Sequence, residues 1–442
     1  MIPGESRLPT SQGEYLAMVE KDNRRNLTVF AGFEFLWGLG MAFGMFAAFA
    51  PAYLEALHSP QWLIGLVLTF PAISASGQLI VSYLIPARWR LRGYVLAYLG
   101  GLLPWLLYSA SSVVWGHFWP PWAHWVLFTL CMAIFIGATG AFTSLYWEIM
   151  TDNTPPDRRG RLFGWRTLGG GISGLAMSFV AIRVLQHWET PRNFRISFLI
   201  GIVLYTISCF VLLWVRDYLN PVHGQQTDQP RLPWIKYAVE AVRELWIDAR
   251  YRRFLFCYIL LMVGITHVPF MVAAAKRDLG ATAQQQGLFV PIYLATVACS
   301  GWVIGWVADR YGYRLVGCLC GVLLAITFSL CLLTRDLFFW YLAFVAYASC
   351  PSIAAALQSN LSAELCPHIP LNRLLAAGNV LVVPLVVISS TVSGALVDFT
   401  GSYTPIFLGG LVISLAAVLG FIFVVREPRS PPLHLVKIIP KG

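Results

Sequence analysis

The chain has 442 residues, of which 57% are hydrophobic and only 12% are charged, and its mean hydropathy is +0.66. Soluble globular proteins carry about 25% charged residues, so this composition excludes that class and predicts a protein that crosses a membrane several times. The net charge of +10 does not indicate a nucleic-acid partner, because the basic residues are distributed along the chain in a pattern typical of membrane topology.

About twelve apolar runs follow one another along the chain, each long enough to cross a hydrocarbon core of about 30 Å. We expect them to be helices, because an unpaired backbone amide is too costly in lipid. Six lie in each half of the chain, at 27–55, 61–85, 93–114, 122–149, 164–187 and 194–217, and at 253–276, 284–307, 313–334, 337–361, 374–398 and 403–425.

These runs divide the chain into two bundles joined by a polar linker. In the linker, apolar residues recur at helical spacing between Ile235 and Ala249, which predicts an amphipathic helix on the membrane surface. Its role stays open between packing on the bundles and regulation. The predicted parts are an N-terminal segment at 1–26, bundles at 27–217 and 253–425, the linker at 218–252 and a tail at 426–442.

The orientation follows from the basic residues. If the N-terminus is cytoplasmic, most of the 31 lysines and arginines fall in cytoplasmic segments. Cytoplasmic loops carry such an excess in membrane proteins. We therefore expect both termini in the cytoplasm and an integral protein of the inner or plasma membrane.

Two pairs of polar loops repeat between the halves. The segments 83–92 and 305–314 align without a gap, which places Arg88 on Arg310 and Arg92 on Arg314. The loops after the fourth and tenth spans align at three positions: Pro156 with Pro370, Arg159 with Arg373, and Gly164 with Gly378. A repeat of this length in an apolar chain is typical of a transporter built from two similar bundles.

The segment 305–314 resembles the G-x-x-x-D-R-x-G-x-x-R loop of the major facilitator superfamily. The residues at the motif positions are Gly305, Asp309, Arg310, Gly312 and Arg314. The resemblance covers nearly the whole chain. It implies an all-α membrane protein with about 12 transmembrane helices in two pseudo-twofold six-helix bundles around one central cavity. It also implies a monomer that rocks between inward-open and outward-open states.

The resemblance further implies a cytoplasmic gate in the second half. In the family, the loop aspartate latches the cytoplasmic side through arginines and the positive end of a neighbouring helix. Asp309 with Arg310 and Arg314 fits this role, and Arg373 at the start of the eleventh span could join them.

The first half departs from this pattern, since Ala87 and Tyr83 replace the aspartate and the first glycine. Either Asp157 or Glu148 substitutes, or the second half alone holds the closed state. The predicted gate consists of charged residues from both halves: Arg88, Arg92, Glu148, Asp157, Arg158, Arg159, Asp309, Arg310, Arg314 and Arg373.

Glycines cluster in the fifth span at 169–171 and at Gly174. The drug-antiporter branch of the superfamily carries a Gly-Pro-x-x-Gly-Gly element there, but this chain has no proline at that point. We therefore interpret the glycines as positions of close helix packing.

Glu34 is the clearest candidate for the transport step, because it lies about two turns inside the first span. An ionisable group within lipid costs about 2.5–3.5 kcal/mol and is usually functional. Three roles stay open: a proton carrier, an attractor for a cationic substrate, and a carboxylate hydrogen-bonded to a neighbouring helix near the inner interface. Trp37 and Met41 follow at helical spacing and would line the same cavity.

His267 lies deep in the seventh span, close to Pro269, which interrupts the helical hydrogen-bond ladder and suits a bending gate helix. It could relay protons, since histidine titrates near neutral pH, or it could be a neutral histidine satisfied between helices. The predicted proton-coupling residues are Glu34 and His267, and the predicted substrate-binding residues are Glu34, Trp37, Met41, Tyr146, His267, Gln358 and Asn379.

Several site types are not indicated by the sequence. The nine cysteines have no paired spacing, so neither a metal site nor a disulfide framework is expected. No nucleotide-binding loop or catalytic constellation stands out, so we expect no cofactor and no enzyme. No buried basic cluster is evident, which argues against a phosphate or dicarboxylate substrate. The expected cavity is aromatic and weakly polar, with one acid.

The sequence therefore predicts a secondary transporter that moves a small amphipathic solute, neutral or cationic, across a lipid bilayer. We expect coupling to protons and slightly favour export over uptake. A facilitator without a coupling ion is the near alternative. The alternative from another class is a non-transporting membrane assembly factor or sensor of the same fold, because architecture does not determine function.

Overall fold

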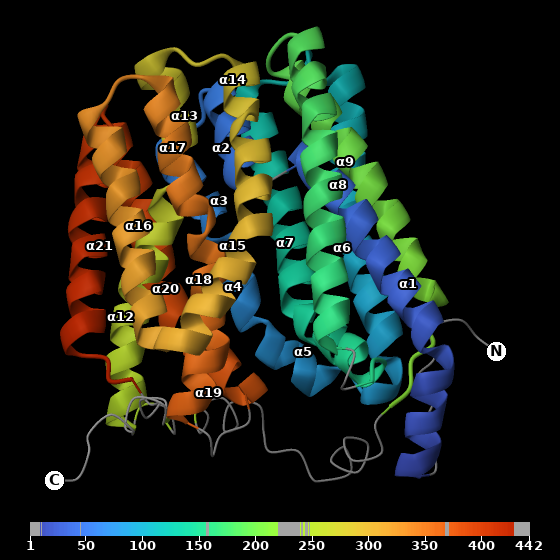
Figure 1. Cartoon of the computed structure of the whole chain (residues 1–442). Coiled ribbons are helices and arrows are strands. Elements are labelled where there is room, and N and C mark those ends of the chain that lie inside the picture. The colour runs from blue at the N-terminus through green and yellow to red at the C-terminus, as the bar shows by residue number, and fades with distance from the viewer. Residues whose placement is uncertain are drawn as a thin grey trace, which may run out of the picture.

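The computed structural model describes residues 9, 11–44, 46–155, 159–219, 239, 242–243, 246, 248–366 and 371–427. The described part is built of helices that run side by side between two ends of the molecule (Figure 1). We call the end at which α1 begins and α21 finishes the near end. The opposite end, where α13 and α14 lie, is the far end.

The described residues of the first half form nine α-helices and two 3₁₀ turns. They are α1 (Gln12–Gly44), α2 (Phe46–Ala56), α3 (Gln61–Leu68), α4 (Phe70–Ser76), α5 (Gln78–Leu84), the 3₁₀ turn Ala87–Trp89, α6 (Arg90–Trp115), α7 (Pro121–Asp152), α8 (Arg159–His187), α9 (Arg192–Val211) and the 3₁₀ turn Leu212–Trp214.

The described residues of the second half repeat this up-and-down course. They form α12 (Ala249–His267), α13 (Phe270–Leu279), α14 (Ala283–Gly287), α15 (Phe289–Tyr311), α16 (Tyr313–Leu333), α17 (Leu337–Ala348), α18 (Cys350–Ala356), a π-helical turn (Leu357–Leu361), α19 (Ser362–Leu365), α20 (Leu371–Thr400) and α21 (Thr404–Phe423).

Eleven helical segments of the described chain are long and apolar enough to cross a membrane. They correspond to eleven of the twelve predicted spans. The second span differs, because it is divided into α3, α4 and α5 at Thr69 and Gly77. Pro71 lacks the amide hydrogen that would continue the ladder. The Thr69 hydroxyl donates to the carbonyl of Leu66 at 2.6 Å at the same break.

Two other boundaries differ from or refine the prediction. The first helix begins at Gln12, well before the predicted start at residue 27, so it extends beyond its apolar part. The seventh span is interrupted between His267 and Phe270, which confirms the break predicted at Pro269. The predicted amphipathic helix falls mostly outside the described residues, and the exact boundaries of the bundles and linker stay predictions.

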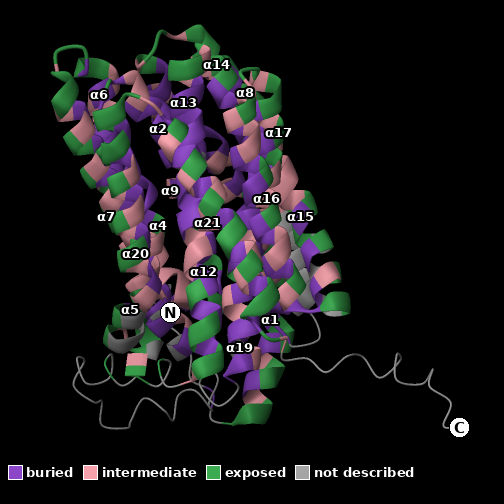
Figure 2. Ribbon diagram, turned by 90° about the vertical axis from the view of Figure 1, so that its left-hand side faces the viewer, coloured by how far each residue is buried: buried purple, intermediate pink, exposed green. Residues whose placement is uncertain are grey.

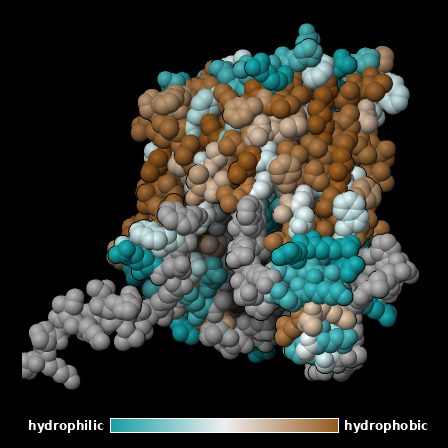
Figure 3. Space-filling view, turned by 45° about the vertical axis from the view of Figure 1, so that its right-hand side comes forward, coloured by the Kyte–Doolittle hydropathy of each residue, from teal (hydrophilic) through white to brown (hydrophobic). Residues whose placement is uncertain are grey.

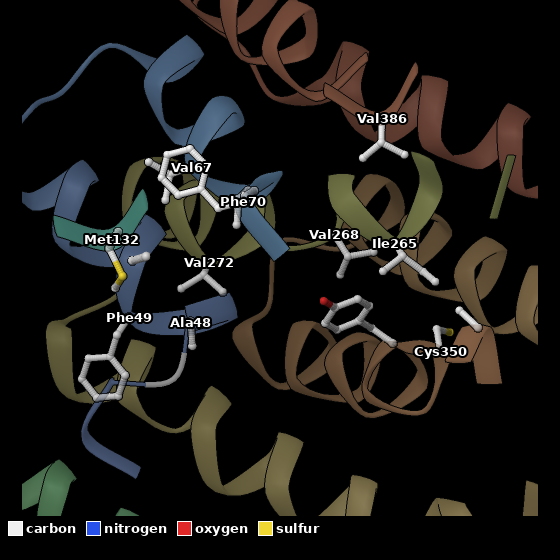
Figure 4. Packing of buried hydrophobic residues seen from close by; sticks show 14 of the residues in the cluster. Ala48, Phe49, Val67, Phe70, Met132, Ile265, Val268, Val272, Cys350 and Val386 are labelled. Carbon is white, nitrogen blue, oxygen red and sulfur yellow. The ribbon is translucent and has the colours of Figure 1, made fainter. Parts of the chain in front are cut away.

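The helices pack as two bundles. In the first, α1 packs on α8 and α9, and α6 packs on α7 and α9. In the second, α16 and α12 pack on α21, and α12 also packs on α20. The bundles meet where α3 and α4 contact α20 and where α8 contacts α15. Ala48 of α2 and Val67 of α3 belong to the same buried apolar cluster as Val272 of α13, and Figure 4 shows Val272 between them.

The outer surface is apolar between two polar ends. A hydrophobic belt separates hydrophilic caps in Figure 3. Figure 2 shows buried and exposed residues alternating along the helices, with exposed residues gathered on the outer sides of the bundles. On α6, for example, Leu96, Leu103 and Leu107 are 55–68% exposed. An exposed apolar surface of this extent is stable only against lipid, so the belt supports a membrane-embedded fold.

Candidate substrate site

A cavity of about 400 Å³ lies in the first bundle, and the described residues that line it come from α1, α4, α5, α6, α7 and α8. Its wall combines aromatic rings with one acid, one base and several uncharged polar groups. These include Glu34, Trp37, Gln78, Tyr94, Tyr98, Thr139, Thr143, Tyr146, Trp147 and Arg166.

The close approach of α1 and α8 brings the charged groups together. A Cβ atom on Gly38 would lie 2.2 Å from the carbonyl oxygen of Gly170, so this contact requires glycine at position 38, while a Cβ atom on Gly170 would lie 3.2 Å from the carbonyl oxygen of Glu34. Glu34 lies one turn before Gly38, and Arg166 lies one turn before Gly170. Residues four apart share a helix face, so the glycine contact also places the carboxylate beside the guanidinium.

This geometry supports the packing interpretation of the fifth-span glycines. A Cβ atom on Gly174 would lie 2.9 Å from the carbonyl oxygen of Gly38. A Cβ atom on Gly171 would meet Ala298 of α15, in the other bundle, at 3.2 Å. At Gly169, by contrast, nothing lies within 4 Å.

Glu34 is 8% exposed, and its Oε1 atom accepts two hydrogen bonds. The hydroxyl of Tyr146 donates to it at 2.9 Å, and Nε of Arg166 donates to the same oxygen. The guanidinium lies over the ring of Trp147, with Cζ 4.3 Å from the centroid. A buried carboxylate is stable only when it is paired and hydrogen-bonded, and this one is both.

The cavity also contains a cation that the sequence analysis did not identify. The sequence led us to expect an aromatic, weakly polar cavity with one acid, and in the structure Arg166 forms an ion pair with that acid, Glu34. Arg166 lies just inside the predicted fifth span and resembles an interface anchor in the sequence. A basic residue within the limits of an apolar run was the signal that could have identified it.

Of the predicted substrate-binding residues, Glu34, Trp37 and Tyr146 line the cavity. Met41 is partly buried and packs on the hydrophobic core instead. Gln358 and Asn379 lie in the other bundle, where the amide of Gln358 donates to Asn379 Oδ1 and joins the π-helical turn to α20. The structure does not bring these two to the cavity.

His267 is 3% exposed and lies between α12 and α20. Its Nδ1 donates to the carbonyl of Val263, so in the neutral ring Nε2 accepts from the hydroxyl of Ser393 at 2.6 Å. Both ring nitrogens therefore have partners, which favours the interpretation as a satisfied neutral histidine.

The near end of the first bundle contains a buried polar network that the sequence did not reveal. Arg90 is 3% exposed and donates to Asp152 at 2.6 Å and to Asp217 at 2.7 and 3.1 Å. Asn153 donates to Asp217 at 2.6 Å, and its oxygen accepts from the amide of Tyr218. The network joins α6, α7 and the segment after α9.

Of the predicted gate residues in the first half, Arg88 is exposed in the 3₁₀ turn before α6. Arg92 has its Cζ 4.8 Å from the ring centroid of Trp89, and Glu148 is exposed on α7. Asp157, Arg158 and the side chain of Arg159 lie outside the described residues.

In the second half, the loop resembling the family motif has a structural role at the near end. Gly312 adopts a φ of 84°, and a Cβ atom there would lie 2.4 Å from the carboxyl group of Glu427. That carboxylate accepts from the amide of Arg314 at 2.9 Å, at the start of α16. The side chain of Arg314 donates to the carbonyl of Phe421 at 3.0 Å, at the end of α21.

The remaining gate candidates are described only in part. Arg310 is exposed and lies over Trp306 and Tyr311, with its Cζ 5.7 and 5.6 Å from their ring centroids. The side chains of Asp309 and Arg373 lie outside the described part of the structure.

The far end holds direct contacts between the bundles. Asp398 at the end of α20 accepts from the amides of Gln61 and Trp62 at 2.8 and 3.0 Å, at the start of α3. The hydroxyl of Ser390 donates to the carbonyl of Gly65 at 2.9 Å. The acid thus satisfies free amides of a helix terminus that belongs to the other bundle.

Solved transporter structures share this fold at low sequence identity. A mutant of the nucleoside transporter NupG has a TM-score of 0.67 and 14% identity, over 90% of this chain and 98% of its own. The xylose transporter XylE from E. coli has 0.62 and 13%, over 91% and 98%. A POT family transporter in complex with 5-aminolevulinic acid has 0.65 and 14%, over 90% and 95%.

No curated protein sequence matches the chain significantly. The family model described as Major Facilitator Superfamily matches twice, over residues 35–267 and 254–437, which correspond to the two bundles. The repeated match agrees with the loop motif, the duplication and the helix packing, and it indicates a transporter rather than an enzyme. The chain therefore belongs to the Major Facilitator Superfamily.

Proposed function

We propose that the protein is a monomeric secondary transporter that moves a small organic solute by alternating access, with the cavity beside Glu34 as its substrate site. The observation that carries this proposal is the buried pair of Glu34 and Arg166 among aromatic rings. A mostly apolar concave site with a few convergent polar groups is the usual form of a small-molecule site. Its aromatic lining suits an amphipathic solute, and we retain a slight preference for export.

We further propose that Glu34 couples transport to protons. Protonation would remove its charge and weaken its attraction to Arg166, so the guanidinium could turn more easily from Glu34 toward the cavity within the first bundle. The carboxyl group of Glu34 would then either bind a proton or pair with Arg166, depending on the conformation of the cavity. His267 has both nitrogens satisfied and is the weaker candidate.

The test is transport into proteoliposomes by the wild type and Glu34→Gln, under an imposed pH gradient, with a panel of radiolabelled nucleosides, sugars, amino acids and dipeptides. We expect Glu34→Gln to lose concentrative accumulation but to retain slower exchange of solute across the membrane without a gradient, because the amide oxygen of glutamine still accepts hydrogen bonds. The exposed carboxylate of Glu189 provides the control substitution Glu189→Gln. Accumulation that survives in Glu34→Gln with its pH dependence intact would refute the coupling role.

A wild type that moves no solute from this panel, but co-purifies stoichiometrically with a membrane complex, would refute the transporter proposal itself. That outcome would support the assembly factor or sensor.

We also propose that both termini are cytoplasmic and that the protein resides in the inner or plasma membrane, from the distribution of its basic residues. The far end is then the outer side. The bundle contacts at Asp398 and Ser390 support a state closed on that side. Labelling of cysteines introduced at the exposed positions Arg88 and Glu189 from either side of intact cells would test the orientation.

A further inference from the structure

The ion pair in the cavity leaves polar atoms without protein partners. Oε1 of Glu34 takes both of its described hydrogen bonds, and no described residue donates to Oε2. Arg166 donates through Nε, while its two terminal nitrogens make no hydrogen bond with any residue that the structure describes. Their side chains are only 10% and 22% exposed, so these atoms face the cavity more than bulk water.

The free atoms are an acceptor and a set of donors side by side. A guanidinium with two free terminal nitrogens is suited to a carboxylate, which it can bind through two parallel hydrogen bonds. A carboxylate oxygen beside it is suited to an ammonium group. A solute with only a negative charge would meet repulsion from Glu34, and a solute with only a positive charge would meet repulsion from Arg166.

We propose that the cavity takes a small zwitterion of the amino-acid class, with its carboxylate on Arg166, its ammonium group on Glu34 and an aromatic or apolar remainder. This inference rests on the proposed function, because it names the substrate class of the same site. A solute with no net charge that carries both groups also leaves the charge balance of the buried pair unchanged.

The walls of the cavity favour a solute whose part beyond the two charged groups is aromatic. Arg166 is held over Trp147, which leaves the edge of its planar group, rather than its face, for a ligand. Trp37 contacts Tyr98 at a centroid distance of 5.5 Å, and Tyr94 stacks on Tyr146 at the same distance. The hydroxyl of Tyr98 is buried and has no hydrogen-bond partner among the described residues. Such a group is costly unless a ligand or water satisfies it.

The test compares four related probes by calorimetry on the purified, full-length protein. L-tyrosine and L-tryptophan carry both charges, tyramine lacks the carboxylate, and 3-(4-hydroxyphenyl)propionate lacks the ammonium group. We expect at least one amino acid to bind at least tenfold more tightly than both singly charged probes. Arg166→Lys should weaken its binding at least tenfold, because lysine keeps the charge but loses the planar fork.

The matched control is Arg183→Lys, which changes an exposed arginine on the same helix outside the cavity and should leave binding unchanged. Equal binding of tyramine or the propionate, or no binding of either amino acid, would overturn the zwitterion inference. If the zwitterion inference fails but the wild type transports thymidine or a sugar, and this transport requires Glu34, the proposed function still holds. If no solute of the transport panel moves, the proposed function fails as well.

Discussion

Two arginines of the first bundle, Arg90 and Arg166, are held by carboxylates away from bulk water. Arg90 is almost fully buried between Asp152 and Asp217, and Arg166 is partly buried against Glu34. Removing one partner of a buried ion pair costs more than the pair contributes, because the remaining charge is left without compensation. The two pairs differ in surroundings: Arg90 is enclosed by protein groups, whereas Arg166 borders the cavity.

At the residue scale, we predict that Arg90→Met lowers the free energy of unfolding by about 3–5 kcal/mol, the usual cost of breaking a buried pair. Asp152 and Asp217 would lose their shared guanidinium. Arg88→Met, two residues earlier at an exposed position, should change stability by less than about 0.5 kcal/mol. Thermal and denaturant unfolding in the same detergent measures both. Equal losses in the two variants would show that the network contributes no more than the exposed arginine.

Helix α8 connects the site to the rest of the molecule through glycines on different faces. Gly170 and Gly174 contact α1 around Gly38, whereas Gly171 faces Ala298 of α15 in the other bundle. Small residues let helix backbones approach closely in a membrane, where no hydrophobic force drives helices together. The same helix therefore positions Arg166 against Glu34 and contributes to the contact between bundles.

At the element scale, we predict that Gly38→Ala destabilises the protein by about 1–3 kcal/mol, as overpacking usually does. The added methyl group would overlap the carbonyl of Gly170, and α1 and α8 would have to separate. Binding at the cavity should weaken in parallel, because Glu34 and Arg166 would move apart.

The matched control is Gly169→Ala on α8, where an added Cβ meets nothing within 4 Å. There the higher helix propensity of alanine should leave stability unchanged or raise it by up to about 1 kcal/mol. Melting curves and ligand titrations of both variants decide the matter. If Gly38→Ala leaves the stability unchanged, the two helices separate without a cost in free energy.

In the mechanism that we propose, the two bundles rock as units and hold together at one end of the molecule at a time. At the near end, each bundle has an acid after its last helix that contacts the start of its third span. Asp217 contacts Arg90 at the start of α6, and Glu427 contacts the amide of Arg314 at the start of α16. These contacts lie within a bundle and can persist through the movement. At the far end, Asp398 and α3 connect the two bundles, so this contact must break for that side to open.

At the scale of the whole molecule, we predict that Asp398→Ala favours states open at the far end. Its carboxylate accepts from two amides across the bundle interface, and capping acids of this kind contribute about 0.5–2 kcal/mol. That range corresponds to an increase of about two- to thirty-fold in the open population. The readout is the labelling rate of a cysteine placed at Thr143 in the cavity, with a reagent supplied from the far side.

The control for this variant is Asp336→Ala. Asp336 is also exposed and also caps a helix near the far end, since it accepts from the amide of Phe338 at 2.9 Å, but that contact stays within the second bundle. Its removal should leave the labelling rate unchanged. An equal rise in both variants would indicate general loosening of the far end rather than release of a contact between bundles.

The sequence by itself determined the membrane class, the helical fold, the two-bundle duplication and the family motif, because each follows from local composition and periodicity. Apolar runs must become helices in lipid whatever surrounds them. It also identified Glu34, Trp37 and Tyr146 as candidates, and it anticipated the break at Pro269 and the packing role of the glycines.

Only the tertiary structure decided which of these residues share a site. Arg166 and Glu34 are 132 positions apart, and they meet because Gly38 and Gly170 let two backbones touch. Gln358 and Asn379 resemble cavity residues in the sequence, yet they satisfy each other. Arg90, rather than its neighbours Arg88 and Arg92, is the arginine buried between two aspartates, because the direction of a side chain at a helix start depends on what packs against it.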